Sequence, residues 1–322
     1  MDFLSVCYHY VRKPDNSFPR ILGTKIEDFE EDIIMLKNRF RMISQDDVLK
    51  SYYEGNKEDS SQKGMLITFD DGLSDHFEAA KILYENDIKG IFFVPTCIIS
   101  DHLPANPTII HYGIAEFGIE KFLEVFHEAL ANNRLNEEKY FLSFQKGKDD
   151  PWEIIKKIKL MFKYNLENSI SRKILLYIYK NLILKKYPNA LEIMHLTEEN
   201  IRKMIEMGHH IGVHTHSHIS VGPSKLSDEE KKTELEMPKR ILEQKFNTKI
   251  ESFSYPFGET VDCVNLDELP DELRQYKIIF TVEEKLNSIK TSPLELGRYQ
   301  PHSTDTTDSL IKKLENIMRK KL

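Results

Sequence analysis

The segment Leu66-Ile67-Thr68-Phe69-Asp70-Asp71-Gly72 decides the expected fold. Its apolar and β-branched residues predict a buried strand, and Asp70-Asp71-Gly72 predicts a turn where that strand ends. Two adjacent carboxylates raise one another's pKa unless a positive charge lies beside them. A divalent metal ion bound by one carboxylate would supply that charge and leave the other carboxylate free to act as a base.

Strands and helices alternate around this segment. An apolar run predicts a first strand over residues 3–10, and apolar residues at three- and four-residue steps predict a helix over residues 26–40. Residues 50–64 are polar and loop-like. A second helix is expected over residues 77–86, followed by a buried strand over residues 90–95 that ends at a proline. This strand–helix–strand order is a βαβ unit, which favours a parallel sheet or barrel.

Residues 103–190 have a different character, with long helical patterns rich in Lys, Tyr, Ile and Leu. They predict a helical insertion packed beside the barrel, within a single catalytic domain that spans residues 1–322. After the insertion, Thr197 is a good N-cap with Asn200 three positions later, and Gly208 is a typical helix stop. The other expected elements are strands over residues 211–214 and 277–282, a strand plus turn over residues 252–258, and helices over residues 228–246 and 306–322.

The composition narrows the class of protein. A net charge of -7 makes a binder of nucleic-acid phosphates unlikely on electrostatic grounds, so no nucleic acid is expected as a partner. The three cysteines are widely spaced and odd in number, which indicates a reducing compartment rather than a disulfide framework. The first residues lack the features of a secretory signal, and no apolar run is long enough for a transmembrane segment. We therefore expect a cytoplasmic protein; the sequence does not predict its oligomeric state.

Histidines are concentrated in one short stretch, since five of the twelve lie between residues 209 and 218. His214 and His218 are four positions apart, a spacing that allows two imidazoles to bind one metal ion. His216 is the rival ligand, because on a straight strand residues 214, 216 and 218 share one face. We prefer His214 and His218, since the strand is expected to end near His214. Two histidines and one acid leave a position open for water, as in catalytic zinc sites. The spare carboxylate then suits a general base.

These motifs resemble those of a known family. The segments 68–72 and 214–218 are similar to the first two motifs of the polysaccharide deacetylase family, carbohydrate esterase family four, and residues 253–258 are similar to the third. The resemblance covers roughly residues 1–100 and 190–300. It implies an α/β fold, a distorted (β/α) barrel of about seven strands, to which the helical insertion is added.

The resemblance also implies roles for individual residues. Asp70 would be the catalytic base. Asp71, His214 and His218 would hold a divalent metal, with Zn²⁺ expected before Ni²⁺, Co²⁺ or Mn²⁺. One wall of the substrate groove would be formed by Tyr255, Pro256, Phe257 and Gly258, with a backbone N–H nearby helping to bind the oxyanion.

Two departures from the family pattern lead to further hypotheses. The third motif usually carries an arginine that orients the base, and here Ser254 occupies that position. Arg298 is the candidate to replace it from a neighbouring strand. The usual family members have an apolar strand that ends in a histidine near the C-terminus. Here such a strand stands first in the chain, as in the circularly permuted branch that includes poly-N-acetylglucosamine deacetylases. We therefore expect His9 to be the acid that protonates the leaving amine, with His302 as the alternative.

The expected function is metal-dependent hydrolysis of the N-acetyl group of an amino sugar. The expected substrate is an N-acetylated sugar or glycan intermediate of surface polysaccharide synthesis. A deformylase of amino sugars and an inactive sugar-binding relative are the alternatives. The insertion also contains basic residues, including Lys159 and Lys163. One hypothesis is that they bind a diphosphate or an anionic membrane surface. The alternative is that they form only the solvated face of amphipathic helices.

Overall fold

The computed structural model describes residues 1–12, 18, 20–55, 63–135, 138–222, 226–302 and 304–319. The strands are β1 (Phe3–Tyr8), β2 (Val11–Arg12), β3 (Thr24–Lys25), β4 (Arg41–Met42), β5 (Gly64–Phe69), β6 (Ile91–Val94), β7 (His210–Val213), β8 (Ser252–Ser254) and β9 (Ile278–Phe280). The helices are α1 (Ile26–Arg39), α2 (Gln45–Tyr53), α3 (His76–Glu85), α4 (Cys97–Ser100), α5 (Asn106–Asn132), α6 (Pro151–Leu160), α7 (Asn168–Ile178), α8 (Leu184–Lys186), α9 (Ala190–Met194), α10 (Glu198–Glu206), α11 (Asp228–Lys231), α12 (Met237–Phe246), α13 (Asp271–Arg274) and α14 (Thr307–Arg319). Short π-helical turns are η1 (Met161–Asn165), η2 (Tyr179–Ile183) and η3 (Lys232–Glu236), and 3₁₀ turns are η4 (Thr260–Asp262) and η5 (Leu266–Glu268).

A curled parallel sheet forms the centre of the molecule. Its strand order is β1-β5-β6-β7-β8-β9, and β4 pairs with β5 off this path. An extended segment after β9 lies between the two outer strands: Leu296 forms a parallel bridge with Phe280 of β9, and Tyr299 forms one with Val6 of β1. Parallel strands that curl round to near closure, with helices outside them, form the distorted (β/α) barrel expected from the sequence.

Strands β1, β5, β6, β8 and β9 are buried on both faces, as expected for a parallel sheet covered by helices. One face packs inside the barrel, where Phe3, Leu66, Phe93 and Phe280 belong to one apolar cluster. The other face packs against the surrounding helices in a second, larger cluster. This two-sided burial explains why the strand sequences read as continuous apolar runs rather than as alternating patterns.

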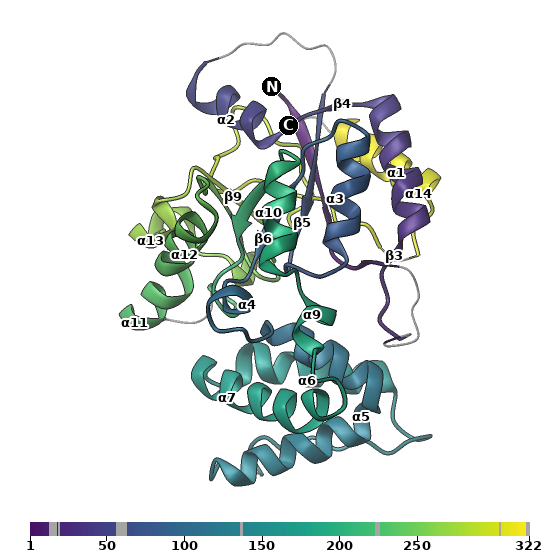
Figure 1. Cartoon of the computed structure of the whole chain (residues 1–322), viewed down its shortest axis with the longest axis vertical. Helices are drawn as coiled ribbons and strands as arrows, with labels where there is room; N and C mark the ends of the chain where they lie inside the picture. The colour runs from purple at the N-terminus through teal and green to yellow at the C-terminus, as the bar shows by residue number, and fades with distance from the viewer. Residues whose placement is uncertain are drawn as a thin grey trace.

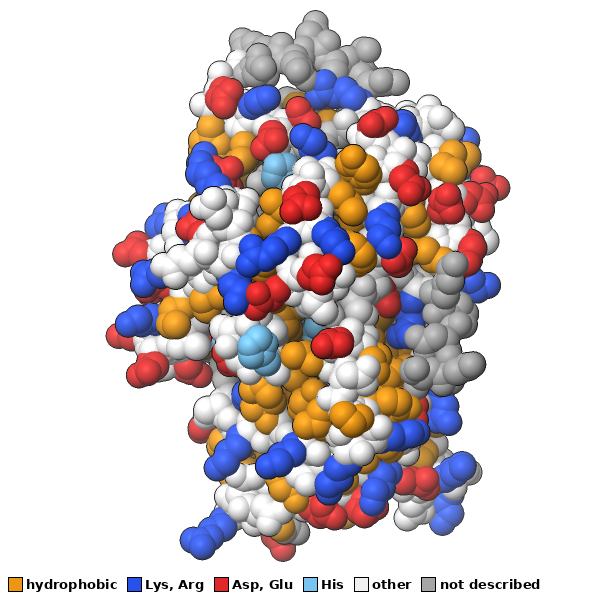
Figure 2. Space-filling model, in the orientation of Figure 1, with side chains coloured by type: hydrophobic (Ala, Val, Ile, Leu, Met, Phe, Trp, Pro, Cys, Tyr) orange, Lys and Arg blue, Asp and Glu red, His pale blue; other side chains and the backbone are white. Residues whose placement is uncertain are grey.

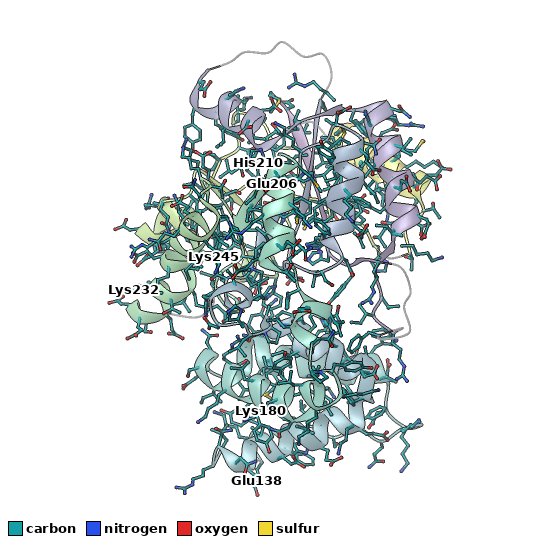
Figure 3. All side chains as sticks on the ribbon, in the orientation of Figure 1. Glu138, Lys180, Glu206, His210, Lys232 and Lys245 are labelled. Carbon is teal, nitrogen blue, oxygen red and sulfur yellow. The ribbon has the colours of Figure 1, made fainter. Side chains whose placement is uncertain are left out.

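Residues 106–194, which comprise α5 to α9, form what we call the helical body. Its apolar side chains make a third cluster of their own. In Figure 1 the helical body lies below the barrel, and β1 runs downward toward it from the N-terminus. His210, the first residue of β7, lies at the end of the barrel away from the helical body (Figure 3), so parallel strands present their carboxyl ends to it. On the face shown in Figure 2, apolar side chains gather where the two parts meet.

Several element boundaries differ from the sequence expectation. The first strand ends at Tyr8 rather than at residue 10. Helix α2 extends to Tyr53, into the predicted loop 50–64, and is started by a Ser44–Asp47 capping box; residues 56–62 of that loop lie outside the described residues. The Thr197–Asn200 cap of α10 is confirmed, because each side chain bonds the other's backbone N–H.

The C-terminal half follows the expected pattern with two qualifications. The predicted helix over residues 228–246 is interrupted by the π turn η3. The tail helix is α14, which begins at Thr307 and is described as far as Arg319; residues 320–322 lie outside the described part of the chain. No helix in the described ranges is long and apolar enough to cross a membrane.

Candidate metal centre and active site

Three predicted ligands converge at the carboxyl end of the sheet. Asp71 follows β5, and His214 and His218 follow β7, on the other side of β6. The Nε2 atoms of His214 and His218 lie 3.3 and 2.9 Å from Oδ1 of Asp71. Ligand atoms from all three side chains lie within 4.8 Å of one another, and all three side chains are buried. This is the size of a site that holds one ion.

The protonation pattern of this cluster fits a cation. Nδ1 of His214 lies 2.8 Å from the carbonyl oxygen of Ser254, which only accepts hydrogen bonds, so Nδ1 carries the proton. In the neutral ring, the Nε2 lone pair then faces Oδ1 of Asp71, a buried oxygen that accepts no hydrogen bond from the described residues. Two lone pairs that face each other in a buried site repel unless a positive charge lies between them. Imidazole nitrogen and carboxylate oxygen together suit zinc and similar divalent ions.

The backbone around the cluster is strained. Non-glycine residues with positive φ are uncommon, yet Asp71 (78°), Thr215 (56°), His218 (65°) and Phe257 (64°) all meet here. Such conformations cost free energy and persist where surrounding contacts impose them, most often at functional sites. Glu234 supplies one such contact, because its carboxylate accepts the backbone N–H groups of residues 216 and 217 at 3.0 and 2.9 Å.

Asp70 is held by a buried arginine. Two nitrogens of Arg298 donate to the two carboxylate oxygens of Asp70 at 2.8 and 2.7 Å, and Arg298 is 0% exposed. Burial alone would raise the pKa of Asp70, but the charge and hydrogen bonds of Arg298 lower it below its usual range. Ser254 completes the group, since its hydroxyl donates to Asp70 at 3.1 Å and accepts from Arg298 at 2.8 Å. Asp70 is therefore an ionised carboxylate, and Arg298 orients it without reaching the protein surface.

The structure brings one of the two candidate acids to this group. Ligand atoms of Cys7, His9 and Asp70 lie within 4.8 Å of one another, and His9 is half-buried. The carbonyl oxygen of His9 accepts a hydrogen bond from Nε2 of His76 at 3.0 Å, which fixes its backbone. His302 is exposed instead and bonds Thr304 at 2.8 Å.

The rival ligand His216 points elsewhere. Its Nδ1 lies 2.9 Å from the hydroxyl of Thr96, and its Nε2 lies 3.1 Å from the carboxylate of Asp101. Both ring nitrogens are therefore engaged, so the cluster with Asp71 contains His214 and His218 and not His216.

The third-motif segment contributes less surface than expected. Tyr255, Pro256 and Gly258 are buried, and Tyr255 packs on Phe253 in the core. Phe257 is partly exposed, and its ring lies edge-on to His218 with 4.7 Å between ring centroids. Phe257 therefore offers the accessible side chain of this segment, and the assignment of residues 255–258 to a wall of the substrate groove stays a prediction.

His195 links the Asp-Asp-Gly turn to the helical body, a role that the sequence did not reveal. Its Nδ1 donates to the carbonyl oxygen of Gly72 at 3.1 Å, and its Nε2 accepts from the backbone N–H of Ala105 at 3.2 Å and lies 3.0 Å from the hydroxyl of Thr108. Burial lowers the pKa of His195 to about 4, so the ring is neutral and can both donate and accept. Both ends of the helical body thus meet at the turn that presents Asp71.

A second contact joins the helical body to the residues around the site. Asp262 is 0% exposed and accepts from Lys163 at 2.8 Å, Tyr164 at 3.0 Å and Ser220 at 2.6 Å. The Lys163 ammonium also lies 4.1 Å from the centroid of the Phe257 ring. In the sequence, this contact leaves only the pattern of a lysine-rich helix. Asp262 lies about a hundred residues after Lys163 and Tyr164, so no local pattern predicts the pairing.

Comparisons with known proteins agree with this arrangement. The family model of polysaccharide deacetylases matches residues 166–276, a range that contains His214, His218 and Tyr255. The match confirms the family resemblance predicted from the motifs and supports a hydrolase that acts on carbohydrate amides. No curated protein matches the chain in sequence.

Solved structures show the same fold across nearly the whole chain. Streptococcus pyogenes deacetylase PplD in complex with acetate is 17% identical, with a TM-score of 0.58, and 98% of each chain is covered. IcaB from Ammonifex degensii is 16% identical, with a TM-score of 0.55 over 98% of this chain and 97% of that one. A de-N-acetylase from Aggregatibacter actinomycetemcomitans is 14% identical, with a TM-score of 0.54 over 97% and 99%. At these identities the likeness shows a shared fold.

Proposed function

We propose that this chain is a metal-dependent carbohydrate N-deacetylase, which hydrolyses the N-acetyl group of an amino sugar to acetate and a free amine. The observation that carries the proposal is the buried cluster of Asp71, His214 and His218 directly beside an ionised carboxylate, Asp70. The family match and the shared fold supply the carbohydrate amide as the substrate class.

Each residue has a defined task in the proposed reaction. Asp71, His214 and His218 would hold a divalent cation, Zn²⁺ before Ni²⁺, Co²⁺ or Mn²⁺, which when bound polarises the amide carbonyl and lowers the pKa of water. Asp70 takes a proton from the attacking water as the water oxygen bonds to the carbonyl carbon. His9 gives a proton to the nitrogen as the C–N bond breaks, so the products are acetate and an amine.

The substrate proposal is an N-acetylated sugar or glycan intermediate of surface polysaccharide synthesis. We place the reaction in the cytoplasm as part of the same proposal. The three cysteines are all free, which agrees with a reducing compartment.

The test is an acetate-release assay on N-acetylated and N-formylated amino sugars, with the purified protein loaded with Zn²⁺. We expect acetate release that a chelator abolishes and added metal restores. Asp70→Asn and His9→Ala should each lower kcat by about 10²–10⁴-fold while bound metal is retained. His302→Ala is the matched control and should leave kcat unchanged.

Three results would redirect the proposal. Preference for the formyl substrate would identify a deformylase. Metal and sugar binding without turnover would identify a sugar-binding relative. A protein that neither binds metal nor releases acetate would contradict the proposed reaction.

A further inference from the structure

His218 lacks the hydrogen bond that fixes the other histidine of the cluster. Nδ1 of His214 donates to the carbonyl oxygen of Ser254 at 2.8 Å, which sets the orientation of that ring. Nδ1 of His218 is buried, yet it makes no hydrogen bond with another residue in the described ranges. Histidines that bind metals usually donate their second nitrogen to a partner. The orientation of His218 therefore depends on the side chains that pack against it.

Two rings pack against His218. Those of His214 and Phe257 are both nearly perpendicular to it, at 79° and 86°, with 4.7 Å between centroids in each pair. This is a favourable arrangement for aromatic rings. Phe257 has a strained backbone, since its φ of 64° is unusual for a bulky residue. Such a conformation persists only where other contacts impose it, so the Phe257 ring requires support from elsewhere.

Lys163 in η1 of the helical body supplies that support. Its ammonium lies 4.1 Å from the centroid of the Phe257 ring, within the range of a cation–π interaction. The same ammonium donates to the carboxylate of Asp262 at 2.8 Å, and the side chains of this pair are only 13% and 0% exposed. A lysine stem is flexible, so the buried ion pair restricts where the ammonium lies over the ring.

Asp262 is anchored to the loop that carries His218. Its carboxylate accepts from Tyr164 of η1 at 3.0 Å and from Ser220 of the loop after β7 at 2.6 Å. Its backbone carbonyl oxygen accepts the N–H of Gly222 at 2.8 Å. The turn η1, the loop after β7 and the loop after β8 therefore meet at one buried aspartate.

We propose that Lys163 is a positioning residue of the metal centre, which holds Phe257 against His218 and so sets the orientation of this ligand. The inference rests on the metal centre of the proposed function and deepens it. Lys163 acts through Phe257 rather than on a ligand directly. Loss of its charge should release the Phe257 ring, loosen the imidazole of His218 and weaken metal binding.

The test measures Zn²⁺ affinity by competition with a chromogenic chelator. Lys163→Met keeps an unbranched side chain without the charge and should lower the affinity by about 10-fold, within the range for groups that orient metal-binding histidines. Lys163→Arg keeps the charge and should retain most of the affinity. Phe257→Leu should cause a loss similar to that of Lys163→Met. The two substitutions together should lose little more, because both interrupt the same contact.

Two further variants separate positioning from a purely structural role. Tyr164→Phe removes a hydrogen bond to the same carboxylate but keeps Lys163 over Phe257, so its Zn²⁺ affinity should equal that of wild type. Lys163→Met leaves the buried charge of Asp262 without its lysine, which by itself destabilises a protein. Lys163→Met/Asp262→Asn removes both charges, and its affinity should fall as in Lys163→Met. Chemical denaturation measures the stability of each variant.

The outcomes distinguish this inference from the proposed reaction. Unchanged Zn²⁺ affinity in Lys163→Met/Asp262→Asn overturns the inference, whatever its stability, and so does an equal loss of affinity in Tyr164→Phe. Acetate release is measured separately. If wild type binds Zn²⁺ but releases no acetate, the proposed reaction fails, and the comparison of affinities still decides the role of Lys163. If wild type binds no divalent metal, both proposals fail.

Discussion

The strand-end loops of the barrel and the helical body meet at the same site, but they contribute to it differently. The loops carry acids and histidines whose spacing alone indicates metal chemistry, and strained backbone holds them in place. The helical body supplies the Lys163–Asp262 contact and the Thr108 hydroxyl beside His195, and the sequence around these residues does not reveal either contact. The comparison teaches that local sequence patterns indicate the metal chemistry of the loops, whereas the contacts of the helical body become visible only in the folded structure.

The largest expected effect comes from the loop side. Asp71→Ala should abolish metal binding and turnover together, because it removes one of the three ligands and leaves two imidazoles to hold the ion. Metal content by mass spectrometry and acetate release by enzymatic assay measure both quantities. His216→Ala is the matched control from the same loop, and its metal content should equal that of wild type. Equal metal loss in the two variants would show that the loop, rather than the cluster, binds the ion.

An intermediate effect is expected at the barrel interior. Arg298→Met leaves the carboxylate of Asp70 buried without its partner, which should cost about 3–5 kcal/mol of unfolding free energy. Ser254→Ala removes two hydrogen bonds, one donated to Asp70 and one accepted from Arg298, and should cost about 1–2 kcal/mol. Chemical denaturation measures both values. Equal losses in the two variants would argue against the charge pair as the main support of Asp70.

The same pair predicts a pH dependence. The folded pKa of Asp70 lies below its unfolded value of about 3.9, so its stabilising contribution is full above that pH and is lost as pH falls through the folded pKa. Arg298→Met should raise the pKa of Asp70, because burial then acts without the opposing charge. The acid limb of kcat/KM should therefore move to higher pH in the variant. An unchanged acid limb would mean that Asp70 is not the base.

The smallest effect is expected where the helical body meets the loops. His195→Ala should weaken metal binding by about 10-fold, because Gly72 loses a donor that orients the turn bearing Asp71. Thr108→Val keeps that donor and changes only the contact on the side of the helical body, so it should leave metal affinity near wild type. Competition with a chromogenic chelator measures the affinity. A loss of stability in His195→Ala without a change in metal affinity would limit His195 to a structural role.

The sequence predicts the barrel well for a physical reason. Strands buried on both faces give continuous apolar runs, and the caps and turns at Thr197 and Asp70 are local signals. The ligand cluster is also predictable, because each motif is short and chemically unusual. Helix α2 was missed although its Ser44–Asp47 capping box is present, because its apolar pattern is short and sits in a polar stretch.

Other features depend on packing that no local pattern encodes. Burial of Tyr255 and exposure of Phe257 follow from how β8 enters the core. His195 and Glu234 resemble ordinary helix-end and helix residues in sequence, yet they hold the two loops that carry the cluster. Their partners are backbone atoms, and in the case of His195 they are also distant along the chain. The spacing of residue types in the sequence therefore does not predict these contacts.

The bridge between β1 and the segment after β9 also has a consequence for protein synthesis. Cys7 donates its backbone N–H to the carbonyl oxygen of Tyr299 at 2.8 Å, beside Arg298. During translation, Asp70 leaves the ribosome long before Arg298 does, so a nascent chain cannot neutralise that carboxylate in the barrel interior. Contacts between such distant parts of a chain form slowly, and domains complete only when their last elements emerge. The order of synthesis therefore delays formation of the buried Asp70–Arg298 pair until the segment after β9 has emerged.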